Sequence, residues 1–226
     1  MQNLSNRLQT AAQFCRDGAA IADIGTDHAY LPIYLVQTGR AVRAIASDIA
    51  PGPLNSAKKN IDAAGLAGFI ELRLGNGLTT IGAQDADDIF ICGMGGLVMS
   101  EMIDNAAWLR QGGKRLILQP MTKAYELRKF LFSSGFDIIA EKAVRDAQKV
   151  YTVMCAEYAG SVDYEDLLCY TGRLAPGTDA FVRDYLIKVC SDLDNRINGA
   201  KVTGDHAAAS YLLSIKAKIE EITDVK

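Results

Sequence analysis

The residues that follow the first apolar run of the chain have the types needed to bind a charged small molecule. The sequence IADIGTDHAYLP spans residues 21–32, and it begins as an apolar run that carries Asp23 and ends at Gly25. A buried apolar run that stops at a glycine is typical of a parallel strand entering a tight turn. Asp27 and His28 then fill the turn, where a doubly wound sheet binds ligands at the carboxyl ends of its strands.

The composition of this turn indicates which ligand fits. It lacks the G-x-G-x-x-G of a dinucleotide site, because Asp27 and His28 occupy places where that motif needs small residues. A carboxylate there opposes a pyrophosphate but tolerates a cofactor that carries positive charge. S-adenosyl-L-methionine has a sulfonium and an ammonium, so the turn is compatible with this cofactor. A histidine in a turn is as consistent with a structural role as with a catalytic one.

A second acid, Asp48, follows the next apolar run, 41–47. A carboxylate at the end of the second strand can accept hydrogen bonds from the two hydroxyls of a ribose. It is equally suited to cap the helix that we expect to begin at Pro51. The sequence leaves both interpretations open.

Glycine-rich turns follow the third and fourth expected strands. Asn76, between Gly75 and Gly77, has an amide that suits an adenine edge, although Asn and Gly also dominate ordinary turns. The run GMGG at 93–96 lets the backbone lie against a flat ring or a reacting methyl group. Its alternative is a phosphate cradle at a helix start. No Lys-Ser or Lys-Thr follows the run, which argues against a Walker-type site.

Gln119 and Pro120 end the fifth expected strand. The amide of Gln119 offers a donor and an acceptor to a base edge, or it is a satisfied structural amide. Tyr30 and Tyr151 have ring faces on which a base can stack, although each is also suited to the core.

The elements that position these residues alternate strands with helices. We expect strands at 19–24, 41–47, 69–74, 89–92, 115–118, 136–144 and 150–158, and helices at 4–15, 28–37, 51–63, 97–105 and 124–133. Five strand–helix alternations followed by two consecutive strands predict an α/β fold with a mostly parallel seven-stranded sheet. The last two strands form an antiparallel hairpin at one edge, and helices cover both faces.

After Gly160 the apolar pattern becomes helical. Apolar stripes at 182–193 and 208–222 flank a break at 199–204, which predicts an antiparallel, coiled-coil-like helical hairpin. The hairpin either folds back on the core or protrudes as an arm that contacts a partner. We therefore expect one domain at 1–160 and a C-terminal helical domain at 161–226.

Composition narrows the class of protein. The 226 residues carry a net charge of −3, and the five cysteines are scattered and never spaced as C-x-x-C. This pattern predicts reduced thiols in a cytoplasm, with no disulfide framework and no metal site. No apolar run reaches the roughly 20 residues of a membrane span, and the first residues lack a signal pattern, so we expect no membrane partner. Basic residues such as those of the pair Arg128-Lys129 are ordinary solvated charges individually, and they can meet a phosphate backbone only if several share a face.

Six segments together resemble the bacterial tRNA (adenine-22-N1)-methyltransferase family of class I S-adenosyl-L-methionine-dependent enzymes. They are LSNRLQTAA (4–12), ADIGTDHAYLP (22–32), GPLNSAK (52–58) after the Asp48 turn, GNGL (75–78), GMGG (93–96) and RLILQP (115–120). The combination is specific, whereas no single segment is. The resemblance implies a Rossmann-like methyltransferase domain and a C-terminal hairpin that helps to hold tRNA.

The resemblance also implies a site. It places the cofactor against Asp23, Gly25, Asp48, Ile49, Asn76, Gly77, Gly93, Met94 and Gly95, the methyl-transfer cleft at Arg7, Asp27 and His28, and the target base near Tyr30, Gln119 and Pro120. Two positions depart from the family pattern. Asn76 replaces an acid, and Met121 stands where the family has an asparagine after Gln-Pro.

The reaction that the resemblance implies is methyl transfer to N1 of adenine 22 in tRNA. The in-plane lone pair of N1 attacks without prior deprotonation, so positioning is the main task of the enzyme. A carboxylate such as Asp27 would stabilise the cationic product. The alternatives are a class I methyltransferase acting on a small molecule or protein, and a non-catalytic RNA-binding module. A nicotinamide dehydrogenase is disfavoured by the missing glycine motif, and we expect a monomer.

Overall fold

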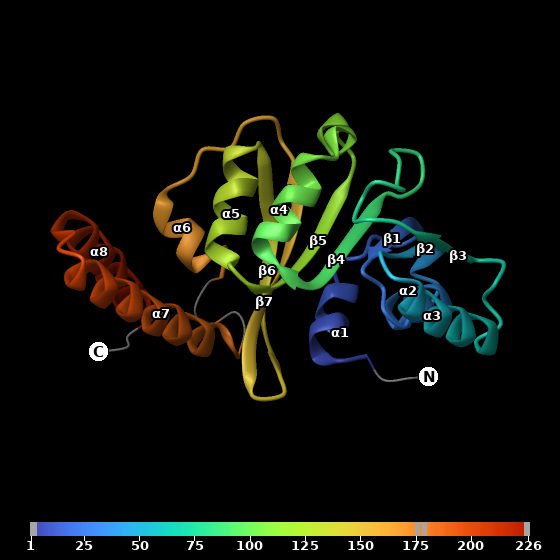
Figure 1. Cartoon of the computed structure of the whole chain (residues 1–226), viewed down its shortest axis with the longest axis horizontal. Coiled ribbons are helices and arrows are strands. Elements are labelled where there is room, and N and C mark those ends of the chain that lie inside the picture. Colours follow the sequence, from blue (N-terminus) through green and yellow to red (C-terminus); the bar gives the residue numbers. More distant parts are fainter. Residues whose placement is uncertain (1–3, 175–176, 178–179, 224–226) are drawn as a thin grey trace.

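The centre of the molecule is a seven-stranded sheet with the strand order β3-β2-β1-β4-β5-β7-β6 (Figure 1). The computed structural model describes residues 4–174, 177 and 180–223. Its strands are β1 (Ala19–Ile24), β2 (Ala41–Asp48), β3 (Ile70–Leu74), β4 (Asp88–Gly95), β5 (Arg115–Thr122), β6 (Phe136–Asp146) and β7 (Lys149–Tyr158). All pairs from β3 to β5 are parallel, and β7 runs antiparallel to both β5 and β6. The expected sheet with an antiparallel edge hairpin is confirmed.

The helices of the body of the molecule follow the strands as expected, with a few shifted ends. They are α1 (Asn6–Ala12), α2 (Tyr30–Gln37), α3 (Pro51–Ala63), α4 (Gly96–Asp104), α5 (Ala124–Ser133) and α6 (Asp166–Thr171), with a 3₁₀ helix η1 at Ala107–Gln111. The helix expected from His28 begins at Tyr30, because Ala29 has a left-handed φ of 57°. The glycine run expected to leave the fourth strand at residue 93 instead extends β4 to Gly95, with an irregular register against β5.

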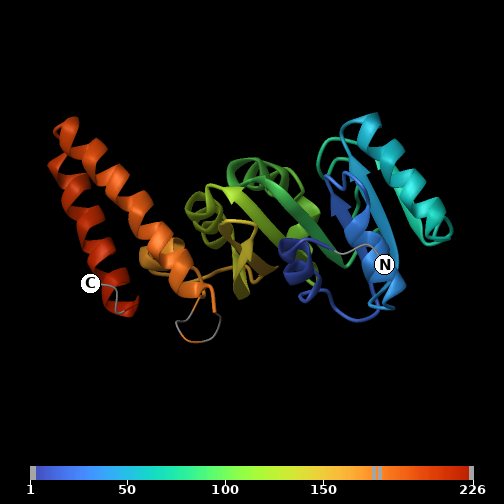
Figure 2. The ribbon, with the colours of Figure 1, turned by 90° about the horizontal axis from the view of Figure 1, so that it is seen from below.

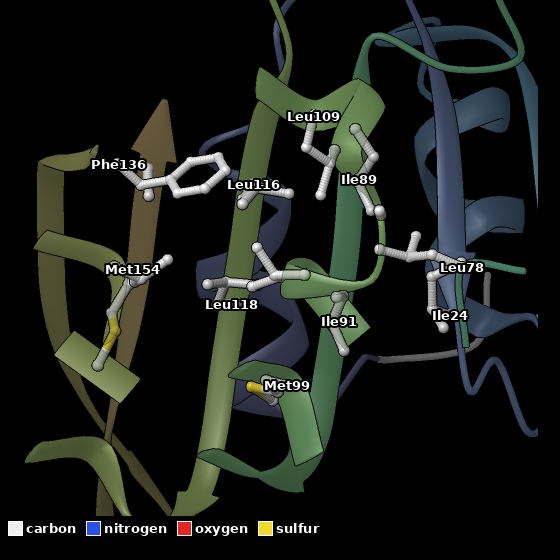
Figure 3. Packing of buried hydrophobic residues seen from close by; sticks show 14 of the residues in the cluster. Ile24, Leu78, Ile89, Ile91, Met99, Leu109, Leu116, Leu118, Phe136 and Met154 are labelled. Carbon is white, nitrogen blue, oxygen red and sulfur yellow. The ribbon is translucent and has the colours of Figure 1, made fainter. Parts of the chain in front are cut away.

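Alternating side chains of the strands fill two cores, one on each face of the sheet. In β4 and β5, Ile89, Ile91, Leu116 and Leu118 join the core beneath α4 and α5 (Figure 3). The intervening residues, such as Phe90, join the core beneath α1, α2 and α3. The period of two is the geometry of a strand buried on both faces. The strands that carry the polar turns are therefore packed on both faces of the sheet.

The chain ends in a helical hairpin of α7 (Val182–Val202) and α8 (His206–Thr223), which we call the arm. Figures 1 and 2 show the arm projecting from the edge of the body near β6 and β7. Leu193 and Ile197 of α7 pack with Leu212 and Ile215 of α8 in a third core. The arm thus protrudes instead of folding back on the sheet. Gly199, expected in the break, lies inside α7. Among the described residues, no helix is long and apolar enough to cross a membrane.

A buried ion pair fixes the base of the arm. The Arg128 side chain, on α5, is 1% exposed and lies 2.7 Å from the Glu141 carboxylate on β6. Its guanidinium also donates to the Tyr185 hydroxyl on α7 at 2.8 Å and to the carbonyl oxygens of Cys169 and Tyr170. The interpretation of Arg128 as a solvated charge is wrong, because its partners come from elements distant in sequence. We call this group the Arg128 clamp.

Candidate active site

The turn after β1 adopts backbone conformations that are uncommon for its residue types. Gly25 has a φ of 74°, and a Cβ at this position would lie 2.3 Å from the Cε atom of Met94. Asp27 and Ala29 have φ values of 50° and 57°, in the left-handed region that non-glycine residues rarely adopt. Such conformations cluster at functional sites, where the surrounding structure compensates for their cost. The turn therefore holds the end of β1 against the end of β4.

Asp23 is a buried carboxylate that has no cationic partner among the described residues. Its residue surface is 5% exposed, and it accepts a hydrogen bond of 2.7 Å from the Thr26 hydroxyl. Burial raises the pKa of Asp23 to about 6, and the nearby charge of Asp48 also raises it. An ionised carboxylate in this environment is stabilised by a positively charged ligand.

Asp48 ends β2 and keeps one oxygen free. Its Oδ1 atom accepts a hydrogen bond of 2.9 Å from the Ala50 backbone, and among the described residues no donor reaches the other oxygen. Because Ala50 is the N-cap of α3, the helix-capping interpretation of Asp48 is wrong. The neighbouring Ile49 side chain is 66% exposed, so apolar surface lies next to the free carboxylate oxygen.

The Asn76 turn is tied to the end of β2 by a hydrogen bond from the Gly75 backbone to the Asp48 carbonyl oxygen. Gly77 is buried with a φ of 57°, and a Cβ there would lie 2.9 Å from Met102 of α4. Asn76 is exposed and lines a cavity of about 330 Å³ with residues of α4. Its carbonyl oxygen accepts hydrogen bonds from Thr79, so it also closes an ordinary turn. The structure leaves both interpretations of Asn76 open.

The glycines at the end of β4 have two different roles. A Cβ at Gly96 would lie 2.3 Å from the Lys123 carbonyl oxygen, so this glycine allows α4 to pack against the β5–α5 connection. Gly93 has a φ of 81°, and its nearest atom would be Nη1 of Arg7 at 3.8 Å. Packing therefore does not explain the glycine at 93, whereas close approach of a ligand does.

Arg7 reaches this strand end from α1. Its Nε donates to Asp146 at 2.6 Å, and its Nη1 donates to the Gln119 side chain at 2.6 Å. Gln119 is fully buried, and its own amide nitrogen donates to the Pro120 carbonyl oxygen at 3.0 Å. Both ends of the Gln119 amide are thus engaged by protein. The residue positions Arg7, with the Met121 sulfur 3.5 Å from Nη1.

Asp27 and His28 present polar atoms to solvent in the turn after β1. The Asp27 side chain is 68% exposed, and its carboxylate lies 3.5 Å from Nε2 of His28. The His28 ring stacks on Tyr30 at a centroid distance of 5.1 Å. The Asn60 amide donates to the His28 carbonyl oxygen at 2.9 Å, which ties this turn to α3. An accessible carboxylate is thus held on a constrained backbone.

This set of groups fits S-adenosyl-L-methionine better than a nucleotide phosphate. The second oxygen of Asp48 suits ribose hydroxyls, and the buried carboxylate of Asp23 suits an ammonium. The open left-handed Gly93 leaves room beside the strand ends. In the part of the chain that the structure describes, no three potential ligands group to hold a metal ion.

Comparisons with known proteins agree with this geometry. Residues 4–154 match the family model described as a methyltransferase domain. The chain is 40% identical over 173 residues to the tRNA (adenine(22)-N(1))-methyltransferase of Bacillus subtilis (strain 168), and the match covers 76% of this chain and 72% of that protein. This chain belongs to the tRNA (adenine(22)-N(1))-methyltransferase family. The resemblance seen in the sequence is confirmed.

Solved structures extend the likeness to the family across the arm. The Bacillus subtilis m1A22 tRNA methyltransferase TrmK matches with a TM-score of 0.86 and 30% identity, covering 99% of this chain and 100% of that one. The M. capricolum TrmK in complex with the natural cofactor product S-adenosyl-homocysteine matches with a TM-score of 0.80 and 30% identity, covering 99% of both chains.

Two residues lie next to Arg7 in a way that the sequence did not predict, although Tyr151 was expected as a ring on which a base can stack. Asp146 was expected only in the polar connection between the last two strands, and it holds Nε of Arg7. The Tyr151 ring lies 5.5 Å from the Arg7 guanidinium carbon. Neither residue is adjacent to a strand-end motif. Their pairing with an N-terminal helix had no local signal in the sequence.

Proposed function

We propose that this chain transfers the methyl group of S-adenosyl-L-methionine to N1 of adenine 22 in tRNA. The observation that carries the proposal is the 40% identity to a tRNA (adenine(22)-N(1))-methyltransferase. The accessible Asp27 carboxylate and the glycine-lined end of β4 are the features that such a reaction needs.

S-adenosyl-L-methionine, when bound, supplies an electrophilic methyl group on a positively charged sulfur. We assign its binding to Asp23, Gly25, Asp48, Ile49, Asn76, Gly77, Gly93, Met94 and Gly95. In this assignment Asp23 faces the ammonium, Asp48 accepts from the ribose, and Ile49 covers one face of the adenine ring. The two carboxylates then balance a ligand of net positive charge.

The remaining groups act on the target nucleotide. Adenine N1 needs no base to remove a proton, so Tyr30 and Pro120 contribute by holding the ring in line with the methyl group. Asp27 stabilises the positive charge that develops on the base, and His28 keeps that carboxylate oriented. A cationic Arg7 would oppose a cationic base, so we assign its Nη2 donors, which have no protein acceptor among the described residues, to the phosphate of the same nucleotide. Turning the base out of its stack costs roughly a few kcal/mol, which these contacts offset.

A labelling experiment tests the proposal. The purified chain is incubated with labelled S-adenosyl-L-methionine and an unmodified tRNA transcript that bears adenine 22, and the digested nucleosides are identified. We expect 1-methyladenosine, and none when that adenine is replaced by guanine. Cofactor binding without label in any tRNA would favour a methyltransferase of small molecules or proteins. An absence of cofactor binding would overturn the site assignment itself.

We further propose that the chain acts as a cytoplasmic monomer, with a cofactor-binding domain at 1–160 and a tRNA-holding region at 161–226. Residues Val162, Tyr164 and Leu168 pack against the core beneath α4 and α5, so the arm is best altered beyond α6. Replacing residues 198–210 by a short Gly-Ser turn should preserve cofactor affinity and weaken tRNA methylation.

Light scattering at the assay concentration tests whether the chain is a monomer, and cell fractionation tests whether it is cytoplasmic.

A further inference from the structure

A cavity of about 510 Å³ opens between the body and the arm. Its walls come from the end of β5, α5, β7, α6 and one face of α7. They include Pro120, Tyr125, Tyr151, Tyr170, Lys188 and Arg196. We call this cavity the junction cleft. Its volume lies within the range of small-molecule and nucleotide sites, roughly 300–1,000 Å³.

Arg196 lies over two tyrosine rings in the junction cleft. Its guanidinium carbon is 5.3 Å from the Tyr125 ring centroid and 5.6 Å from the Tyr170 ring centroid. Among the described residues, no carboxylate lies within ion-pair distance of this exposed guanidinium. Stacking on aromatic rings fixes the plane of an arginine and leaves its N–H donors available. The side chain is therefore oriented before a ligand arrives.

Lys188 links the junction cleft to Arg7. Its Nζ lies 5.6 Å from the Tyr151 ring centroid and donates to the Val150 carbonyl oxygen at 3.2 Å. The same Tyr151 ring lies 5.5 Å from the Arg7 guanidinium carbon. The carbonyl oxygen of Pro120, another wall residue, accepts a hydrogen bond from the Gln119 amide and so orients it. The oxygen of the same amide accepts from Arg7. The junction cleft thus adjoins the place where we put the target nucleotide.

The charges that face the junction cleft leave it with an excess of cations. Lys123 is paired with Glu126 at 3.1 Å, and Arg128 is neutralised by Glu141 within the clamp. Of the remaining charged residues in the wall, Lys188 and Arg196 are positive and Asp192 is negative, which leaves one net positive charge. Several basic residues outside the cleft are paired with acids, as Arg115 is with Glu157 at 2.7 Å. A net positive, aromatic cleft is suited to a phosphate-bearing ligand.

We propose that the junction cleft binds the phosphate backbone of the nucleotides that flank the target adenine, with Arg196 and Lys188 as the phosphate ligands. This inference rests on the proposed function, because it takes tRNA as the substrate. The planar fork of Arg196 matches two phosphate oxygens, and Lys188 supplies a point charge. Eight residues along a helix span about 12 Å, so the two cations contact different phosphates.

The test compares Arg196→Ala and Lys188→Ala with the unaltered chain in tRNA methylation. We expect each variant to raise the KM for tRNA about tenfold, with kcat and cofactor Kd unchanged, because a phosphate contact is lost outside the reacting centre. The slope of log Kd for tRNA against log salt concentration should fall by about one per variant. Arg183→Ala is the matched control, since Arg183 lies on α7 about 140° around the helix from both residues.

Each other outcome overturns the inference. If the unaltered chain methylates tRNA and both variants keep its KM and salt slope, the junction cleft does not contact the substrate, while the proposed function stands. If Arg196→Ala abolishes binding of adenosine monophosphate but leaves the KM for tRNA unchanged, the cleft serves a small anionic ligand instead. If the unaltered chain methylates no tRNA, the proposed function and this inference fail together.

Discussion

Arg7 and Arg128 show how differently this molecule uses the same side chain. Each arginine pairs with a carboxylate, Arg7 with Asp146 at 2.6 Å and Arg128 with Glu141 at 2.7 Å. The Arg7 side chain is 22% exposed and keeps Nη2 without a protein acceptor among the described residues, whereas Arg128 is 1% exposed and uses every nitrogen. Spare donors at a strand end mark the site, and saturated donors in the interior mark the architecture.

The acids of the two regions differ in the same way. Both oxygens of Glu141 are occupied, since Oε2 also accepts from the Arg173 backbone at 2.9 Å. Gly172 has a φ of 67°, and a Cβ there would lie 2.1 Å from Glu141, so the chain closes tightly over the clamp. In the described part of the chain, Asp23, Asp27 and Asp48 are each bonded at fewer positions than Glu141 is. The hydrogen bonds of the Arg128 clamp are complete and hold the arm, whereas the strand-end carboxylates keep acceptor positions for a ligand.

The largest effect is expected from breaking the Arg128 clamp. Arg128→Ala leaves Glu141 buried without its cation, and the free energy of unfolding should fall by about 3–5 kcal/mol. Arg7→Ala removes a pair whose side chains are each 22% exposed and leaves the Gln119 oxygen without its donor, so the loss should be smaller, about 1–2 kcal/mol. Urea unfolding of both variants measures the difference. Equal losses would contradict the division between a structural and a functional arginine.

Asp27→Asn should affect chemistry more than stability or cofactor binding. Asparagine tolerates the left-handed backbone of this position, so the turn is kept while the negative charge is lost. We expect kcat to fall about 100-fold, as for removal of other transition-state charge partners. The cofactor Kd, measured by calorimetry, should change much less. An unchanged kcat would remove Asp27 from the mechanism.

Gly25→Ala should weaken cofactor binding by its clash with Met94. The added Cβ would lie 2.3 Å from Cε of Met94, and the φ of 74° disfavours any side chain. We expect the cofactor Kd to rise about tenfold, and Met94→Ala in the same chain to recover part of the loss, because only the clash is relieved. Gly39→Ala is the control, since Gly39 has a φ of 72° and open space around its Cα. If Gly25→Ala and Gly39→Ala raised the cofactor Kd equally, the clash with Met94 would not be the cause.

The smallest effect is a pH dependence of cofactor affinity. The pKa of Asp23 is about 6 because the carboxyl is buried. A cationic cofactor favours the ionised form, so affinity should fall as pH decreases through this value, about fourfold between pH 7.5 and 5.5. Asp23→Asn should remove the dependence.

The same pKa gives a stability effect of opposite sign. Without ligand, the folded protein binds the Asp23 proton more tightly than the unfolded chain does. The contribution to stability is therefore full below about pH 4 and is lost as pH rises through about 6. Calorimetry across this pH range measures the effect on cofactor affinity, and thermal unfolding without cofactor measures the effect on stability.

Local patterns in the sequence were sufficient to predict most elements and the strand-end residues. The bounds of β1 and α5 agree with the expected ranges. Asp23 and Gly25 were predicted because they lie within and at the end of the first apolar run, and Asp48 because it follows the second. The short η1 and α6 were missed, since five or six residues contain too little periodicity. Glu141 and Asp146 were missed because burial and partner choice come from contacts between distant segments.

The order in which the chain emerges during synthesis gives Arg7 a particular place in assembly. Its two anchors, Gln119 and Asp146, lie 112 and 139 residues later in the chain. The strands that carry Asp23 and Asp48 are translated early, whereas Arg7 has no fixed position until the β6–β7 hairpin has been made. Because domains fold as their residues leave the ribosome, the cleft around Arg7 is completed only after the β6–β7 hairpin has emerged. A nascent chain that can already form its first strands therefore has no ordered Arg7 with which to engage RNA.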